Sequence, residues 1–256
     1  FYIMPIIAIR IMKKHSVLIL GAQSDIAKSI AKKFGENNYN LVLAAKNIDE
    51  LKIQSIDLKV RYNIVVDIYE FDVLKNENYE KFIKNLKEVP SIVICAIGFM
   101  GEQKENERNS DLRTKVLRTN YEGPINIISE LANIYENQGY GTIVGISSVA
   151  GDRGRSSNYI YGSAKAGFTT FLSGLRNRLA KKNVHVLTVL PGTVYTKMTL
   201  GLKLPKIFTS YPDKVASDIF KSIMKKKNII YTMGIWRLIM MIIKLIPERI
   251  FKKLKL

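Results

Sequence analysis

Residues 16–45 read SVLILGAQSDIAKSIAKKFGENNYNLVLAA, and this stretch decides the fold. The short, mostly apolar run 16–20 ends in Gly21. Ile26, Ile30 and Phe34 then recur at helical spacing, and a second apolar run follows at 41–45. Apolar residues spaced in this way predict a strand, a helix and a second strand.

The same alternation continues along the chain. Further strand-like runs lie at 64–71, 92–97, 142–146, 184–190 and 229–231, and long helical patterns at 113–135 and 158–181. Seven strands with intervening helices predict an α/β fold, a doubly wound parallel sheet of Rossmann type covered on both faces. No linker or composition shift appears before residue 233, so we expect one domain over residues 12–233. Its ligand should bind at the carboxyl ends of the strands.

Composition excludes several classes of site. One cysteine, Cys95, leaves no disulfide framework or cysteine-rich metal centre, and two histidines, His15 and His185, leave little room for a histidine-built one. We therefore expect a reduced, cytoplasmic protein without a metal. Forty basic and 22 acidic residues give a net charge of +18, which favours an anionic partner or reflects a general excess of lysine. No nucleic-acid-binding motif is present, so nucleic acid is not expected as a partner.

The two ends differ from the body. Residues 1–11 are mostly apolar but too short to span a bilayer, and Met12 is a natural start, so we interpret 1–11 as an extension, with an N-terminal anchor as the alternative. Residues 234–256 form a basic amphipathic tail: residues 235–245 are largely apolar, and residues 235–256 hold six basic residues and Glu248, which gives +5. Such a tail suits a helix lying at an anionic membrane surface. The alternative is a helix that packs against another subunit.

The turn after the first run carries a weak nucleotide signal. Gly21 allows a tight turn and a close approach of the backbone to a pyrophosphate, and Ala27 allows close helix packing. Asp25 is unfavourable beside a phosphate and is interpreted as a possible helix cap.

The second strand ends without the acidic residue that NAD-binding proteins use for the ribose 2′-hydroxyl. Lys46 stands there instead and suits a 2′-phosphate, so NADP(H) is favoured over NAD(H). Asp72, after the third strand, is either an acceptor for the adenine amino group or a turn residue.

The strongest candidate for catalysis follows the fifth strand. Ser148 ends that strand, and Tyr161 and Lys165 lie four residues apart on one face of the next helix. A nearby ammonium lowers the pKa of a tyrosine towards the range useful for proton transfer. Ser148 could then hydrogen-bond a substrate oxygen while Tyr161 transfers its proton.

These residues resemble the short-chain dehydrogenase/reductase family from Met12 to Tyr231. The intervals from Ser148 to Tyr161 and Lys165 match, Asn120 matches the family asparagine that holds a proton-relay water, and residues 191–196 resemble its P-G-x-V-x-T segment. The resemblance implies that Lys165 also bonds the nicotinamide ribose. The predicted cofactor-binding residues are Gly21, Gln23, Ser24, Asp25, Ile26, Lys46, Asp72, Val73, Ala96, Ile97, Gly98, Tyr161, Lys165, Pro191, Gly192, Val194 and Thr196.

Two departures from the family pattern point to one branch. Asp25 and Ala27 replace glycines, and the usual N-A-G reads Ala96-Ile97-Gly98 after Cys95. Both changes, and the tail, resemble reductases of decaprenylphosphoryl-2-keto-pentose, which complete epimerisation of a lipid-linked ribose to arabinose. The resemblance implies NADPH-dependent reduction of a keto-sugar linked to polyprenyl phosphate, a partner oxidase, a homo-oligomer and a place at the inner membrane face. We expect residues 193–212 to form a substrate lid, because loops after such strands often close over ligands. The alternatives are a soluble ketone or 3-oxoacyl reductase and an NADP-binding scaffold or sensor.

Overall fold

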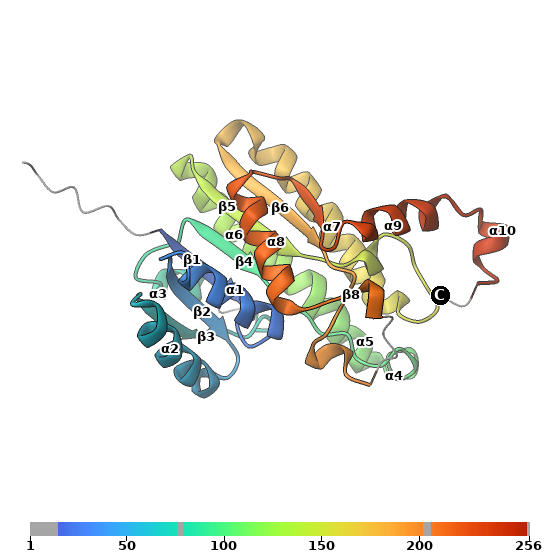
Figure 1. Ribbon diagram of the computed structural model, residues 1–256, viewed down its shortest axis with the longest axis horizontal. Coiled ribbons are helices and arrows are strands. Elements are labelled where there is room, and N and C mark those ends of the chain that lie inside the picture. Colours follow the sequence, from blue (N-terminus) through green and yellow to red (C-terminus); the bar gives the residue numbers. More distant parts are fainter. Residues whose placement is uncertain (1–14, 76–78, 202–205, 255–256) are drawn as a thin grey trace, which may run out of the picture.

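The computed structural model describes residues 15–75, 79–201 and 206–254. Seven strands form one parallel sheet in the order β3-β2-β1-β4-β5-β6-β9 (Figure 1). The strands are β1 (Ser16–Leu20), β2 (Asn40–Ala45), β3 (Val66–Glu70), β4 (Ile92–Cys95), β5 (Gly141–Ile146), β6 (Val184–Leu190) and β9 (Ile229–Tyr231). The predicted doubly wound sheet is confirmed, and its order reverses between β1 and β4, where such folds bind ligands.

Helices cover both faces of the sheet and create two cores. On one face, α1 (Asp25–Gly35), α2 (Ile48–Tyr62) and α8 (Pro212–Met224) bury apolar side chains such as Phe34, Leu51 and Ile219. On the other, α3 (Tyr79–Asn85), α6 (Gly123–Gln138) and α7 (Tyr159–Leu179) bury Phe82, Ile127 and Phe168. Burial on both faces explains why the strands read as continuous apolar runs.

One expected helix is interrupted at a functionally placed residue. The pattern over 113–135 predicted a single helix, but the chain forms α5 (Ser110–Leu117), then a π-helical turn (Arg118–Glu122), and then α6. The turn contains Asn120, which is fully buried. Such turns insert one extra residue per turn and often accompany functional sites. The short helix α4 (Gln103–Arg108) precedes α5.

The tail forms α9 (Ile235–Leu245) and α10 (Glu248–Phe251), which extend away from the sheet at one end of the molecule (Figure 1). One side of α9 packs on the body of its own chain, where Trp236 and Met240 are buried with Val149 and Leu190. Among the described helices, none is long and apolar enough to cross a bilayer.

Two predicted segments lie wholly or partly outside the described residues. The extension, residues 1–11, lies outside them, as do residues 202–205 of the expected lid. In the described part of the lid, β7 (Thr193–Val194) pairs in parallel with β8 (Thr209–Ser210). Lid closure stays a prediction.

Candidate active site

The carboxyl ends of the strands open into two adjoining cavities. The first, of about 380 Å³, is lined by Ser148, Tyr161 and Lys165 and is called here the catalytic cavity. The second, of about 410 Å³, is lined by Lys46 and Asp72 and is called the Lys46 cavity. Both are lined by Gln23, Ser24, Ala96, Ile97 and Gly98, so they adjoin at the turn that follows β1.

Gly21 is required at that turn. Its φ is +79°, a left-handed conformation that L side chains rarely adopt, and a Cβ there would lie 3.0 Å from the Ile97 backbone nitrogen. Ser24 caps α1, because its Oγ accepts from the Ala27 amide at 3.2 Å. The interpretation of Asp25 as the cap is therefore wrong. Asp25 lies within the first turn, and its Oδ2 accepts from the Lys197 amide at 2.6 Å.

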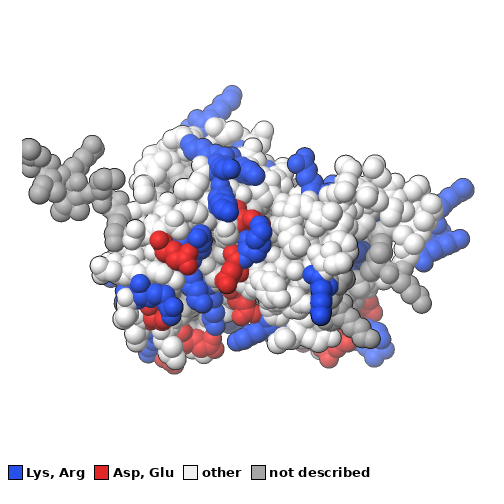
Figure 2. Space-filling model, in the orientation of Figure 1, with Lys and Arg blue, Asp and Glu red and all other residues white. Residues whose placement is uncertain are grey.

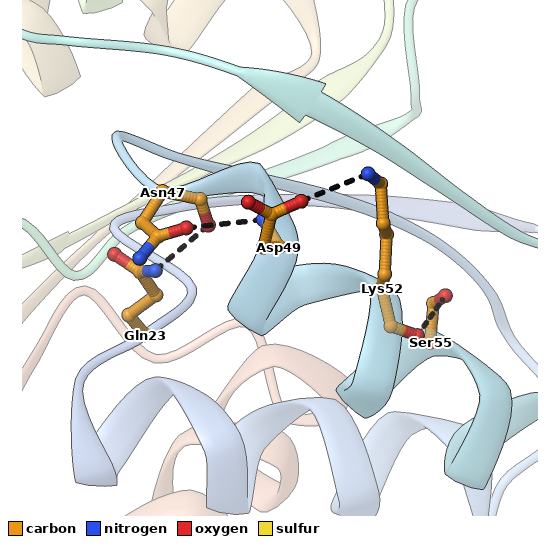
Figure 3. Close-up of polar contacts among 5 residues, drawn as sticks. All are labelled: Gln23, Asn47, Asp49, Lys52 and Ser55. Carbon is orange, nitrogen blue, oxygen red and sulfur yellow. Dashed lines mark hydrogen bonds and ion pairs between the residues drawn. The ribbon is translucent and has the colours of Figure 1, made fainter.

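The turns after β1 and β2 are tied together by side chains (Figure 3). Gln23 donates from Nε2 to the Asn47 carbonyl at 2.8 Å, and Asn47 Oδ1 caps α2 by accepting from the Asp49 amide at 3.0 Å. Lys52 then pairs with Asp49 at 2.8 Å. These bonds fix the β2–α2 turn, which carries Lys46.

Lys46 and Asp72 form an ion pair in the wall of the Lys46 cavity. Their ion pair is 3.2 Å long, with 61% of the Lys46 side chain exposed and 14% of that of Asp72. Asp72 Oδ1 also accepts from the Leu74 amide at 3.0 Å, so it is a turn residue as well. The ammonium of Lys46 therefore lies at the cavity wall but shares its charge with a carboxylate.

Lys165 is buried at the bottom of the catalytic cavity. Its Nζ donates to the carbonyl oxygens of Ile146 at 3.0 Å, the last residue of β5, and of Ile97 at 3.4 Å, in the loop after β4. Burial lowers the pKa of Lys165 to about 8, against the opposing effect of Cys95. The two carbonyls hold the ammonium in place. A pKa of about 8 means that Lys165 loses its proton within the pH range of ordinary enzyme assays.

Tyr161 lies one turn before Lys165 on α7. Burial raises the pKa of Tyr161 to about 12, and a hydrogen bond with Ser148 lowers it only in part. The expected lowering by Lys165 is not seen. The Lys165 Nζ lies 5.8 Å from the centre of the Tyr161 ring and is bonded to backbone carbonyls. The phenol therefore stays protonated at neutral pH, as a proton donor must.

Ser148 begins the 3-10 turn Val149–Gly151, and its Oγ accepts from the Ala150 amide at 3.1 Å. Pro191 supports this turn, because its carbonyl accepts from the Val149 amide at 3.0 Å. Ser147, the neighbouring serine, instead donates to the Lys165 carbonyl at 2.9 Å. Ser148 is thus the serine that lines the cavity with Tyr161, and Ser147 anchors α7.

Asn120 lies behind the cavity rather than in its wall. Its Nδ2 donates to the carbonyls of Phe99 and Val116, at 2.5 and 2.8 Å, and its Oδ1 accepts from the Phe99 amide at 3.2 Å. These bonds place the π-helical turn against the loop after β4. A Cβ at Gly98 would lie 3.4 Å from Asn120 Oδ1 and 3.8 Å from Lys165 Nζ, so this loop separates the two side chains.

The structure brings the remaining predicted residues together. All the predicted cofactor residues line one cavity or the other: Gly21, Lys46, Asp72 and Val73 the Lys46 cavity, and Asp25, Ile26, Tyr161, Lys165, Pro191, Gly192, Val194 and Thr196 the catalytic cavity, with the shared residues between them. Asn120 is the one predicted site residue that lines neither.

Sequence reasoning missed a wall of the catalytic cavity supplied by the tail. Trp236 lines it and donates from Nε1 to the Phe208 carbonyl at 3.0 Å. A Cβ at Gly192 would lie 2.0 Å from the Trp236 indole, so the glycine makes room for the ring. The sequence holds one signal for this contact. The single tryptophan of the chain lies in the tail, which the sequence pattern assigns to a membrane surface or a subunit interface. Arg155, Asn158 and Met198 also line the cavity and were not predicted.

The chain resembles known proteins in both sequence and structure. The family model for short chain dehydrogenases matches residues 15–204. The chain belongs to the short-chain dehydrogenase/reductase family. It is therefore an oxidoreductase that acts on alcohol and ketone groups with a nicotinamide cofactor. The left-handed Gly21 turn, which a Cβ would crowd, and the continuous pair of cavities fit a dinucleotide.

Individual relatives agree with this family. An uncharacterized oxidoreductase of Mycobacterium tuberculosis is 29% identical over 241 residues, covering 93% of this chain and 96% of the relative. A 3-oxoacyl-[acyl-carrier-protein] reductase of Bos taurus is 26% identical and covers 72% of this chain and 77% of its own. A short-chain dehydrogenase of Sphingobium yanoikuyae, solved with NADPH, has a TM-score of 0.78 at 20% identity, covering 91% of this chain and 97% of its own.

Proposed function

We propose that this protein is an NADPH-dependent ketoreductase whose substrate is a keto-sugar attached to polyprenyl phosphate. The observation that carries the proposal is the double role of α9. One face of this helix lines the catalytic cavity through Trp236, and the rest presents apolar and basic side chains outwards. A surface suited to a membrane therefore lies beside the substrate cavity.

The side chains around the catalytic cavity suit the reduction of a ketone. The nicotinamide cofactor supplies the hydride when bound. Tyr161 donates its phenolic proton to the carbonyl oxygen, and Ser148 donates a hydrogen bond to that same oxygen. Lys165 donates to two main-chain carbonyls, and Asn120 fixes the loop that carries Gly98. In our proposal Asn120 also supports proton resupply, and Lys165 bonds the nicotinamide ribose.

The preference for NADPH rests on the end of β2. Ala45 stands where an acidic residue would repel a 2′-phosphate, and Lys46 follows it at the cavity wall. Asp72 holds the ammonium of Lys46 near the cavity without removing its charge. A 2′-phosphate can share the ammonium with this carboxylate.

The outward surface of the tail supports membrane docking. Leu238, Met241, Ile242 and Leu245 are about half exposed or more, and Arg237, Lys244, Arg249, Lys252 and Lys253 are exposed among them. Figure 2 shows mostly uncharged surface over α9, with Lys and Arg projecting at the end formed by α10. Apolar side chains rimmed by cations suit the interface of an anionic bilayer, where each cation contributes about 1 kcal/mol. We propose peripheral attachment on the cytoplasmic side, with a partner oxidase that supplies the ketone.

Vesicle flotation tests the tail without unfolding the body. Truncation after Met233 would remove the buried Trp236 and Met240, so we choose the exposed residues Met241, Ile242 and Leu245 and replace all three with glutamate. We expect the wild type to float with phosphatidylglycerol vesicles and not with phosphatidylcholine vesicles, and the triple variant to stay unbound. Glutamate at Ile53 and Ile56, two exposed apolar residues of α2, is the matched control and should leave flotation unchanged.

A parallel assay tests the substrate. Wild-type enzyme should oxidise NADPH faster with a polyprenyl-phosphate-linked 2-keto-pentose than with the free sugar. Equal rates, with no flotation on either vesicle, would contradict the proposal. If the triple variant instead has a lower molecular mass in solution than the wild type, the tail is a subunit interface of a homo-oligomer. The favoured activity would then be that of a soluble ketone or 3-oxoacyl reductase, as in the bovine relative.

A further inference from the structure

Arg155 occupies an unusual position beside the reacting groups. It lies in the loop between the 3-10 turn Val149–Gly151 and α7, and it lines the catalytic cavity together with Ser148 and Tyr161. The residue as a whole is partly buried, and its Nε is buried and has no hydrogen-bond partner among the described residues. The proposed reduction of a ketone makes no use of this guanidinium.

A guanidinium in such surroundings is costly to the folded protein. Removal of a cation from water is unfavourable unless an anion or several acceptors replace the water. Burial lowers the pKa of Arg155, with Asp152 as the one opposing charge. The Asp152 carboxylate is itself engaged, because Tyr231 donates its hydroxyl to Oδ2 at 2.9 Å.

Arg153, two residues earlier, shows what a structural arginine in this loop looks like. Its Nη1 donates to the carbonyls of Ile243 and Ile246, at 2.5 and 2.7 Å, and its Nη2 pairs with Glu248 at 3.0 Å. Its guanidinium also lies 3.6 Å from the centre of the Phe251 ring. Arg153 thus has acceptors on the tail, whereas the buried Nε of Arg155 has none on the described residues.

Asn158 adds a second polar group without a partner in the same cavity. It is the residue before α7, its side chain makes no capping bond, and its Oδ1 is buried with no partner. The 21-residue helix that follows begins here, so its positive end lies at this point. The Arg155 guanidinium and the start of α7 both favour an anion beside Tyr161, and Asn158 Oδ1 can accept a hydrogen bond from a hydroxyl of the same ligand.

We infer that Arg155 binds an anionic group of the ketone substrate. We assign the anion to the molecule being reduced because Arg155 lines the catalytic cavity with Ser148 and Tyr161 and is absent from the wall of the Lys46 cavity. The ligand chemistry is that of phosphate or carboxylate oxygens, which a guanidinium binds through paired hydrogen bonds. This inference rests on the proposed reductase function and extends it by placing a charge near the reducible carbonyl.

Three small ketones test the inference in the full-length protein with NADPH. Dihydroxyacetone phosphate carries the phosphate, acetoacetate carries a carboxylate, and dihydroxyacetone is the uncharged reference. We expect wild-type kcat/KM to favour an anionic ketone. A lost charge-assisted hydrogen bond should reduce that preference by about 10- to 100-fold in Arg155→Gln. Arg155→Lys, which keeps the charge but not the fork, should fall between. Arg61→Gln, at an exposed arginine of α2, is the matched control.

A binding measurement separates this inference from the reductase proposal. Trp236 is the only tryptophan and lines the same cavity, so its fluorescence reports ligand binding without turnover. Titration with dihydroxyacetone phosphate in the presence of NADP⁺ should give a dissociation constant that rises in Arg155→Gln. If the wild type reduces neither these ketones nor the polyprenyl-phosphate-linked 2-keto-pentose but this dependence is found, the proposed function fails and the anion site stands.

Two results would overturn the anion site. One is an equal dissociation constant for the phosphate in the wild type and in Arg155→Gln, with an equal preference among the ketones. The other is a raised KM for NADPH in Arg155→Gln with the ketone preference unchanged, which would assign the guanidinium to the cofactor. A melting temperature of Arg155→Gln no lower than that of the wild type shows that loss of binding is not loss of folding.

Discussion

The two cavities of the cleft are built in opposite ways. In the catalytic cavity Tyr161 and Lys165 are 9% and 3% exposed, and Lys165 is held by carbonyl oxygens at the end of β5 and in the loop after β4. In the Lys46 cavity the side chain of Lys46 is 61% exposed and has one acidic partner, Asp72. The first arrangement is fixed by the fold itself, whereas the second depends on side chains that water can also solvate.

This difference separates the expected effects of substitutions. Buried groups with fixed partners act on the reacting atoms, so their loss should appear mainly in kcat. An exposed ammonium contributes to affinity and is screened by salt, so its loss should appear mainly in KM and remain modest. Substitutions of buried and exposed residues, with kcat and KM measured for each, test whether the two cavities differ in this way.

The largest effect is expected at Tyr161. Tyr161→Phe removes the proton donor and keeps the ring, so kcat for ketone reduction should fall by about 10²- to 10⁴-fold. The dissociation constant for NADPH should change little, which fluorescence titration measures. Activity equal to that of the wild type would remove Tyr161 from the catalytic role.

The next effect is a pH dependence set by Lys165. Because burial lowers its pKa to about 8, Lys165 carries its proton below that pH and loses it above. The ammonium form has three donors, two for the carbonyls of Ile146 and Ile97 and, in our proposal, one for the nicotinamide ribose. The value of kcat/KM for ketone reduction should therefore be level below pH 8. Above it, the value should fall by about tenfold per pH unit. A profile that stays level to pH 10 would show that the charge of Lys165 is not needed.

The smallest effect is expected at Lys46. Lys46→Gln removes an exposed charge, so KM for NADPH should rise by about 3- to 10-fold while KM for NADH stays the same. Lys52→Gln is the matched control, because this lysine also forms an exposed ion pair but lies outside both cavities. A larger change with NADH than with NADPH would contradict the assignment of the 2′-phosphate to Lys46.

The fold could be predicted because it depends on local patterns. Strands buried on both faces give continuous apolar runs, and the seven predicted runs are the seven strands of the sheet. The π-helical turn at Asn120 could not be predicted in this way, because α5 before it has a single buried residue, Val116, which is too few to reveal the change of phase that one extra residue causes. The fourth predicted strand was also too long, since residues 96 and 97 leave the sheet to line the cavities.

The candidate site was predicted where one motif carries its own spacing, as Ser148, Tyr161 and Lys165 do. Contacts between distant segments were missed. Trp236 reaches the cavity only because Gly192 leaves room for the indole, and nothing in the local sequence of the tail indicates that partner. The direction of the Tyr161 pKa was missed for a similar reason, because burial in the folded chain outweighs the hydrogen bond with Ser148.

Arg153 holds the tail mainly through main-chain oxygen atoms, those of Ile243, Lys244 and Ile246. Every amino acid offers the same carbonyl, so side chains along this part of the tail are free to vary during evolution while the attachment is kept. Arg153 itself is not free to vary in this way, because a single codon change there removes all of these bonds at once. Natural variants of the tail should therefore tolerate drift in its outward residues far better than drift at this one position in the body.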